Sequence, residues 1–305
     1  MRIAVMGAGG VGAYFGARLA AAGEDVVFIA RGAHLAALRA HGLRIESALG
    51  DVALSPTEAS DDPAAVGPVD LVIFAVKLYD SESAAEATRP LAGPGTGVVT
   101  LQNGVDSVAV LTRALGADHV IGGAAHIAST IAAPGLIRHT GTMARLQLGE
   151  RRGGQSERVA ALSQALEQAG VDHQVSDDIE RDIWAKMVFL ATFSGLTALT
   201  RSSIGPIRAD ADTRALYQAG LTEALAVAHA KGIALPEDFV ARTLARTDQL
   251  PAEMKSSLLH DLEAGRRLEL PWLSGAIVRM GKELGIATPT HAFITTALKL
   301  RAGGG

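Results

Sequence analysis

The chain has 305 residues, of which 48% are hydrophobic, 20% charged and 4% aromatic. This length is enough for two domains with separate cores, and the composition is that of an ordinary globular α/β protein. A formal net charge of −4 offers no basic excess that would favour nucleic acid as a partner. The absence of cysteine excludes disulfides, thiolate metal sites and a cysteine nucleophile, and it fits a reducing cytoplasm.

The first residues predict a strand that leads directly into a dinucleotide-binding turn. Residues 3–6 form an apolar run, and Gly7, Gly9 and Gly12 follow at the G-x-G-x-x-G spacing before a helical stretch over 12–22. The first glycine permits the tight turn, the second lets the backbone approach a pyrophosphate, and the third packs the helix on the sheet. The pyrophosphate would lie at the helix N-terminus, where unpaired N–H groups favour negative charge. The predicted cofactor contacts in this turn are Gly7, Ala8, Gly9, Gly10, Val11 and Gly12.

The second strand indicates which dinucleotide is bound. Residues 25–30 form this strand, and Arg31 follows it at the position where an NAD site usually carries an acid for the ribose 2′-hydroxyl. A guanidinium binds a phosphate through two parallel hydrogen bonds and keeps its charge. With no acid at this strand end to compete, the sequence predicts NADP(H).

The first half of the chain alternates strands with helices, and the second half is helical. Apolar runs at 71–76, 98–101 and 120–123 enclose helical segments at 81–91 and 105–115, which is typical of a parallel, doubly wound sheet. Alternation over 125–148 predicts antiparallel strands, and 156–169 predicts a helix. Beyond about residue 177 the periodicity is helical, with segments at 179–199, 212–231, 236–247, 257–263, 273–284 and 291–300.

The predicted fold class is therefore α/β, with an N-terminal Rossmann-type domain over 1–172 and an all-α domain over 173–305. No apolar run approaches the length that a bilayer requires, so we expect a cytoplasmic chain without a membrane span. No group of histidine and acidic residues has metal-ligand spacing, so we expect no metal site.

Lys186 is the most informative residue outside the glycine turn. It lies in a helical segment that is apolar on nearly every face, where a buried ammonium is costly unless it has a partner or a task. Helical spacing places Lys186, Leu190 and Ser194 on one stripe. Lys186 could supply the proton that a carbonyl oxygen needs when hydride reaches its carbon. The alternative is a lysine whose stem packs inside while its amine reaches water.

Three further positions are candidates for substrate or cofactor contacts. Glu269 lies in a mostly apolar passage before Pro271, where it could accept a substrate hydroxyl, hold Lys186 charged, or simply favour a helix dipole. Lys77 and Asn103 each follow a predicted parallel strand, and ligands bind at the carboxyl ends of such strands. The alternatives are a surface lysine and an ordinary Asn-Gly turn.

Taken together, these residues resemble the ketopantoate reductase (2-dehydropantoate 2-reductase) family over essentially the whole chain. The resemblance implies NADPH-dependent reduction of a 2-oxo acid, with Lys186 as the general acid and Glu269 positioning the substrate hydroxyl. It implies that Arg31 binds the 2′-phosphate, that Lys77 lies beside the cofactor, and that Asn103 and Ser257 contact substrate or nicotinamide. It also suggests a homodimer. The resemblance is carried by Gly7 to Gly12, Arg31, Lys77, Asn103, His126, Trp184, Lys186, Ser256, Ser257, Asp261 and Glu269.

The chain departs from the family pattern on the side that would face the substrate. Leu190 and Ser194 stand where active members typically carry asparagines, and Pro271 replaces a typical aspartate. Lost amide partners cost about 1–3 kcal/mol for a buried polar substrate group, which is enough to change substrate preference. Ketopantoate and a less hydroxylated 2-oxo acid therefore both stay open as substrates. A 3-hydroxyacid-type dehydrogenase and a catalytically silent NADPH-binding regulator are the alternatives.

Overall fold

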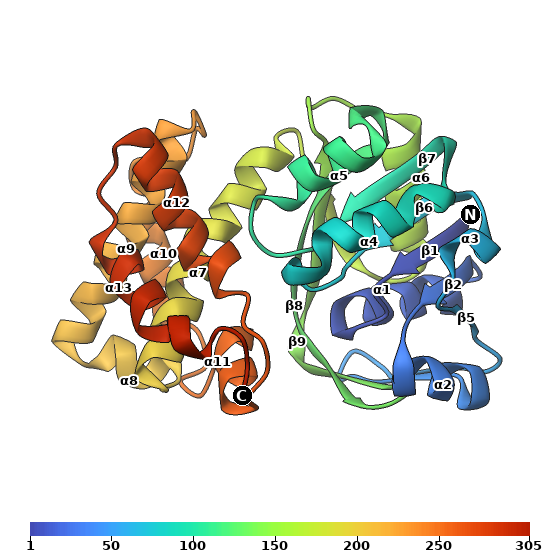
Figure 1. The fold of residues 1–305 in the computed structure, drawn as a ribbon, viewed down its shortest axis with the longest axis horizontal. Helices are drawn as coiled ribbons and strands as arrows, with labels where there is room; N and C mark the ends of the chain where they lie inside the picture. The colour runs from blue at the N-terminus through green and yellow to red at the C-terminus, as the bar shows by residue number, and fades with distance from the viewer. The chain divides into compact units, whose positions relative to one another are not determined.

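The computed structural model describes residues 1–305, which divide into two compact units, Met1–Asp182 and Ile183–Gly305 (Figure 1). The first unit is a mixed sheet covered by helices, and the second is entirely helical. The division falls later than the expected boundary after residue 172. The reason is that β10 (Asp172–Val175) still pairs with β9 (Leu136–Glu150) in the sheet, and the first long helix begins only at Ile179.

The sheet of the first unit has ten strands in the order β4-β3-β9-β8-β7-β6-β1-β2-β5, with β10 also paired to β9. The strands from β8 through β5 are all parallel, as predicted. The predicted antiparallel finish is confirmed by the β8–β9 hairpin. Besides β9 and β10, the strands are β1 (Arg2–Met6), β2 (Asp25–Ile29), β3 (Leu43–Glu46), β4 (Val52–Leu54), β5 (Glu58–Ser60), β6 (Val69–Phe74), β7 (Ala92–Thr100) and β8 (Val120–Ala133).

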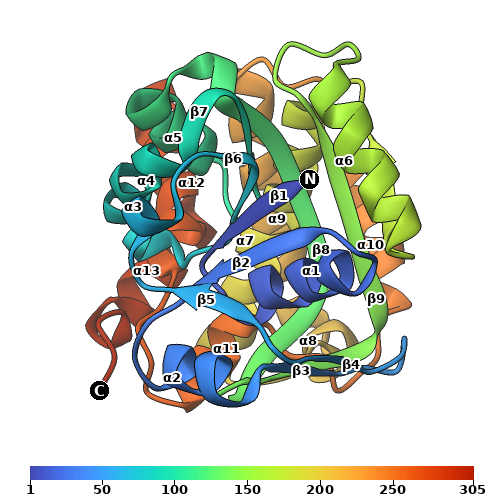
Figure 2. The same cartoon turned by 90° about the vertical axis from the view of Figure 1, so that its right-hand side faces the viewer.

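Helices cover both faces of this sheet, so the sheet has a separate core on each side (Figure 2). Side chains of β1 alternate between the cores: Ile3 and Val5 join one, and Ala4 and Met6 join the other. The first core takes residues from α1 (Gly10–Ala21), α2 (Gly32–His41) and α6 (Glu157–Gln168). The second takes residues from α4 (Ser81–Thr88) and α5 (Ser107–Leu115). This arrangement is the predicted doubly wound architecture.

The segment between β2 and β6 holds elements that the sequence did not reveal. It contains α2, the short strands β3, β4 and β5, and the one-turn helix α3 (Pro63–Val66). The three strands have only three or four residues each, which is too short for a convincing alternation pattern. Their pairing is set by neighbours far along the chain, as when β3 pairs with β9. The short 3-10 helices of this unit are η1 (Leu78–Asp80), η2 (Arg89–Leu91) and η3 (Ala117–His119).

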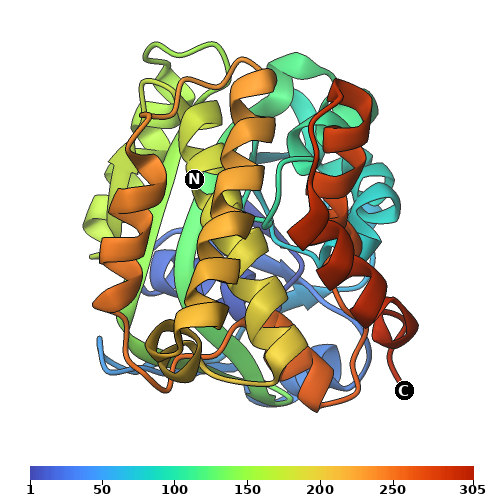
Figure 3. The ribbon, with the colours of Figure 1, turned by 90° about the vertical axis from the view of Figure 1, so that its left-hand side faces the viewer.

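The second unit consists of the helices predicted from the periodicity, together with the six-residue α8, which was not predicted. Figure 3 shows its long helices side by side. Its elements are α7 (Ile179–Thr200), α8 (Ile204–Ala209), α9 (Ala211–Ala230), α10 (Phe239–Asp248), α11 (Ser257–Glu263), η4 (Leu270–Trp272), α12 (Ser274–Leu284), α13 (Pro289–Leu298) and η5 (Lys299–Arg301).

Helix α7 is the central element of this unit. The hydroxyl of Ser274 at the start of α12 donates to the carbonyl of Ala191, and Gly220 of α9 leaves no room for a Cβ beside Thr192. At Gly195, an added Cβ would come within 2.9 Å of Ile294 on α13. Small residues on α7 and α9 thus let three helices approach α7 closely, and this packing explains its nearly uniform apolar composition.

The same helix corrects one expectation. By length and composition α7 could cross a membrane, whereas we expected no such segment. Buried core helices have this composition too, and 61% of the most apolar window of α7 is buried inside the structure. The packing against α9, α12 and α13 identifies α7 as a core helix.

Candidate functional site

Four loops of the first unit meet at one edge of the sheet because their strands are parallel neighbours. In the order β7-β6-β1-β2, the carboxyl ends lead into Asn103, Lys77, the glycine turn and Arg31. Backbone bonds hold these ends in register: Ala75 N–H donates to Met6, and Leu101 N–H donates to Phe74, both at 2.9 Å. The structure therefore brings together all the residues that the sequence proposed for dinucleotide binding.

The glycine turn has the backbone geometry predicted for it. Gly7 has a φ of +98°, which a side chain rarely tolerates, and a Cβ there would also lie 2.8 Å from the backbone nitrogen of Val76. A Cβ on Gly12 would lie 3.0 Å from Val5 and 3.1 Å from Ala75, so the predicted close packing of helix on sheet is confirmed. A Cβ on Gly9 would meet nothing within 4 Å, so the protein itself leaves that position open.

Gly10 has a structural reason to lack a side chain. A Cβ on Gly10 would collide with the backbone of Ser129 on β8. Helix α1 begins there with Gly9 as its N-cap, without a side-chain cap and without an acidic residue in its first turn. Its first N–H groups therefore have no partner within the helix, and no acidic side chain of its first turn faces them, which is the arrangement that an anion favours.

Arg31 lies at the tip of β2 as predicted, but an acid does compete for it. Its Nη2 lies 2.8 Å from Oδ2 of Asp80, and the Arg31 side chain is 79% exposed. The expectation that no acid faces Arg31 is therefore wrong. Asp80 follows β6, far along the chain from β2, and the two strands flank β1 in the sheet, so only the tertiary structure brings this carboxylate to the guanidinium.

Gln102 was not predicted to contribute to this edge, and it links two of the loops. Its side chain is 6% exposed, and its Nε2 donates to the carbonyl of Val76 at 2.9 Å and to the hydroxyl of Ser81 at 2.8 Å. Ser81 in turn donates to the carbonyl of Leu78. Because a carbonyl only accepts, these bonds fix the orientation of the Gln102 amide. Gln102 thus holds the loop that carries Lys77 against the loop that carries Asn103.

In the helical unit, the negative charge of Glu269 acts on the ammonium of Lys186. Lys186 is half-buried on α7, and Glu269 is buried at 6% exposure, directly before η4. Burial lowers the pKa of Lys186 from 10.5 to about 8, while the negative charge of Glu269 opposes that shift. An amine with this pKa exchanges its proton near neutral pH, which is what an acid–base group requires.

The two other residues on the Lys186 stripe differ from each other. Leu190 is half-buried, whereas Ser194 is fully buried and its hydroxyl has no hydrogen-bond partner. The structure therefore gives no support to the expectation that Ser194 contacts a ligand directly. Helical spacing put Ser194 on the stripe, but α12 and α13 cover the neighbouring Gly195.

Ser256 and Ser257 have separate environments although they are adjacent. Ser256 is buried, caps α11 by accepting from the N–H of Leu259, and accepts a 2.7 Å bond from the hydroxyl of Thr197 on α7. Ser257 is exposed at the first position of α11. Ser256 therefore joins α11 to the helix that carries Lys186, and Ser257 is the one that can meet a ligand.

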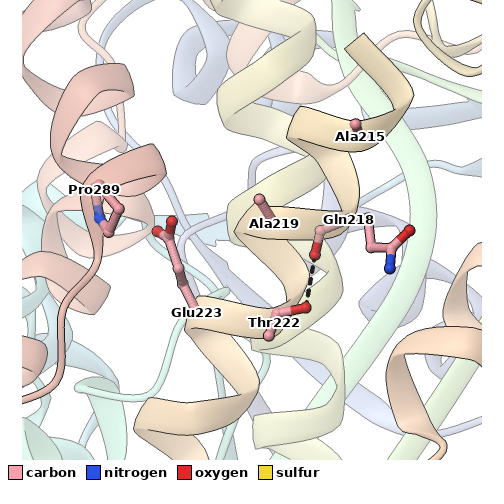
Figure 4. Close-up of a pocket in the computed structure, with 6 residues that line it drawn as sticks. All are labelled: Ala215, Gln218, Ala219, Thr222, Glu223 and Pro289. Carbon is pink, nitrogen blue, oxygen red and sulfur yellow. Dashed lines mark hydrogen bonds between the residues drawn. The ribbon is translucent and has the colours of Figure 1, made fainter. Parts of the chain in front are cut away.

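A shallow pocket on the helical unit contains none of these residues. Figure 4 shows its lining, which comes from α9 and the start of α13: Ala215, Gln218, Ala219, Thr222, Glu223 and Pro289. Its one charged group is Glu223, whose two carboxylate oxygens accept the N–H groups of Thr290 and His291. Glu223 thus caps α13, and the pocket is a product of helix packing.

Comparison with known proteins supports a dinucleotide-binding unit followed by a helical unit over the whole chain. A Rossmann-type unit with a glycine turn, followed by a helical unit, is an architecture of two-domain oxidoreductases that use a nicotinamide cofactor. Residues 3–153 match the family profile for ketopantoate reductase PanE/ApbA, and residues 178–302 match the profile for its C-terminal domain. The chain belongs to the ketopantoate reductase family, whose members are oxidoreductases.

Individual relatives agree with this assignment. The chain is 36% identical to a 2-dehydropantoate 2-reductase of Mesorhizobium japonicum, over 95% of this chain and 94% of the relative. The crystal structure of 2-dehydropantoate 2-reductase from Geobacter metallireducens superposes with a TM-score of 0.92 at 35% identity, covering 98% and 99% of the two chains. The ternary structure of D-mandelate dehydrogenase with NADH and anilino(oxo)acetate has the same fold, with a TM-score of 0.90 at 23% identity over 99% and 98% of the chains.

Replacing Gln102 by glutamate tests its role at the sheet edge. Gln102→Glu keeps the size but removes both donated bonds and sets a carboxylate against the Val76 carbonyl, so we expect dinucleotide affinity to fall about tenfold. Titration of NADPH by fluorescence measures this. The matched control is Thr96→Val in the middle of β7, where the Thr96 hydroxyl donates to the carbonyl of Val69. It should lower the thermal midpoint similarly without changing affinity, and equal affinity losses in both variants would contradict the role.

The adjacent serines provide a second test. Ser256→Ala removes a helix cap and a bond from Thr197, and we expect it to lower the free energy of unfolding by about 1–2 kcal/mol. Ser257→Ala should leave stability unchanged and raise KM for the 2-oxo acid. Thermal unfolding and steady-state kinetics on both variants measure the contrast. A loss of stability in Ser257→Ala as large as in Ser256→Ala would contradict the assignment.

Proposed function

We propose that the chain catalyses the NADPH-dependent reduction of a small 2-oxo acid to a 2-hydroxy acid, with 2-dehydropantoate as the first candidate substrate. The observation that carries the proposal is the pairing of Lys186 with Glu269 in the helical unit. Burial and a single carboxylate leave Lys186 with a pKa of about 8, so the group is both charged at neutral pH and able to release a proton.

The residues at the sheet edge fit a dinucleotide. The open position at Gly9 and the uncapped, acid-free start of α1 suit a pyrophosphate, and Arg31 supplies an exposed cation for a 2′-phosphate. Lys77, exposed after β6, and Asn103, half-buried after β7, would lie along the rest of the cofactor.

The chemistry assigned to the chain is proton transfer and orientation. A bound reduced nicotinamide supplies the hydride that forms the new C–H bond at C2 of the oxo acid. The ammonium of Lys186 donates a proton to the carbonyl oxygen as the C=O double bond becomes a C–O single bond, so the product is a hydroxyl and Lys186 is left neutral. Glu269 favours the charged form of Lys186 before the reaction and accepts a hydrogen bond from the substrate hydroxyl.

Leu190 bears on which 2-oxo acid is used. It stands half-buried one turn after Lys186, at a position where an amide would grip a hydroxylated substrate. A leucine offers apolar contact instead, which favours a substrate with an alkyl group there. Both 2-dehydropantoate and a less hydroxylated relative fit this proposal.

NADPH oxidation in the presence of 2-dehydropantoate and a panel of plain and branched 2-oxo acids tests the proposal. Turnover of 2-dehydropantoate would support the first candidate, and turnover of only an unhydroxylated acid would support the alternative. Absence of turnover across the panel, despite tight NADPH binding, would contradict the reductase proposal and favour a regulator.

Replacing Lys186 tests its role as the acid. We expect Lys186→Ala to lower kcat by about 10²–10⁴-fold while NADPH still binds, because the lost group acts on the oxo acid. Lys231→Ala, which removes an exposed lysine at the end of α9, is the control and should keep full activity. A Lys186→Ala enzyme with near-normal kcat would overturn the assignment.

The pH dependence of the reduction rate follows from the pKa of Lys186. Only the ammonium form donates a proton, so reduction should slow as pH rises through about 8, and the reverse oxidation should speed up over the same range. Glu269→Gln removes the charge that raises the pKa of Lys186, so the fall in reduction should move to lower pH. Profiles of kcat between pH 6 and pH 10 check this, and an unmoved profile in Glu269→Gln would argue against the pairing.

A further inference from the structure

The Arg31–Asp80 ion pair joins the two loops that follow the neighbours of β1 in the sheet. Arg31 follows β2 and Asp80 follows β6, and these strands lie on either side of β1. One bond of 2.8 Å joins Nη2 of Arg31 to Oδ2 of Asp80, and the Asp80 side chain is 31% exposed. Both groups are therefore accessible at the edge assigned to the dinucleotide.

The two side chains prefer opposite chemical groups on an adenosine ribose. A guanidinium binds a 2′-phosphate, whereas a carboxylate accepts a hydrogen bond from a 2′-hydroxyl and repels a phosphate. Arg31 has five N–H donors and uses only one of its terminal nitrogens on Asp80, so donors are left over for a phosphate. Asp80 nevertheless cancels the net charge that Arg31 would offer alone.

We propose that Asp80 is a specificity-determining residue that limits the preference for NADPH and lets this chain also bind NADH. The inference rests on the proposed function, because it assumes that the sheet edge binds a nicotinamide dinucleotide. Arg31 recognises the 2′-phosphate of NADPH, and Asp80 recognises the 2′-hydroxyl of NADH. In the absence of a dinucleotide the two side chains pair with each other, and either dinucleotide breaks this ion pair when it binds.

Dissociation constants for NADPH and NADH, measured by fluorescence titration without any oxo acid, test the inference. We expect the wild-type constants to lie within about tenfold of each other, and Asp80→Asn to shift their ratio by about tenfold toward NADPH, since one like charge beside the phosphate is lost. The shift should shrink as salt rises to 0.5 M, because the pair is exposed. Arg31→Ala should weaken NADPH far more than NADH.

Asp25→Asn is the matched control. Asp25 begins β2, and its Oδ2 pairs with Nη1 of Arg2 at 2.7 Å, so this variant makes the same charge change on an exposed Arg–Asp pair at the opposite edge of the sheet. It should leave the ratio unchanged.

Three results would overturn the inference. The first is an unchanged ratio in Asp80→Asn, and the second is an equal shift in Asp25→Asn. The third is a shift toward NADH in Asp80→Asn, which would mean that Asp80 only holds Arg31 in place for the phosphate. Wild-type protein that binds neither dinucleotide would refute the proposed function itself, and that result is distinct from these three.

Discussion

Parallel pairing of β1 with β2 and β6 is the constraint on which the rest of the first unit depends. It sets the carboxyl ends of these strands and of β7 side by side, so residues as far apart in the chain as Gly7 and Asn103 share one edge. The strand ends are then locked by the bonds of Gln102 to the Val76 loop and by the close contact of Gly7 with Val76. A glycine turn without this register would be an ordinary turn, and Arg31 would be an ordinary surface cation.

In the helical unit, the main constraint is the ammonium of Lys186, which lies on an apolar helix. Helix α7 is packed by α9, α12 and α13 through small residues. On the same helix, burial makes Lys186 costly to charge. Glu269 offsets part of that cost from a segment more than eighty residues away. The balance leaves the lysine titrating near pH 8, where complete burial without a partner would keep it neutral and full exposure would keep it charged.

Pairing between charged side chains also limits how far a sequence motif can predict cofactor specificity. Arg31 at the end of the second strand favours NADP(H) when it is considered alone, yet Asp80 neutralises it in the folded chain. In the same way, helical spacing puts Ser194 in line with Lys186, while packing removes Ser194 from solvent. Both cases show that the environment of a side chain decides its chemistry as much as its position along the chain does.

The sequence by itself determined the architecture and the glycine turn. Strong periodicity and glycine spacing reflect local geometry, so the parallel sheet, the helical second unit and the conformations of Gly7 and Gly12 could be predicted, while the roles of Lys186 and Glu269 stay predictions. Strands β3 to β5, the approach of Gly10 to β8, the bonds of Gln102 and the Asp80 partner of Arg31 were decided by the tertiary structure. These features depend on contacts between segments far apart in the chain. A local sequence pattern does not indicate which distant residue a side chain will contact.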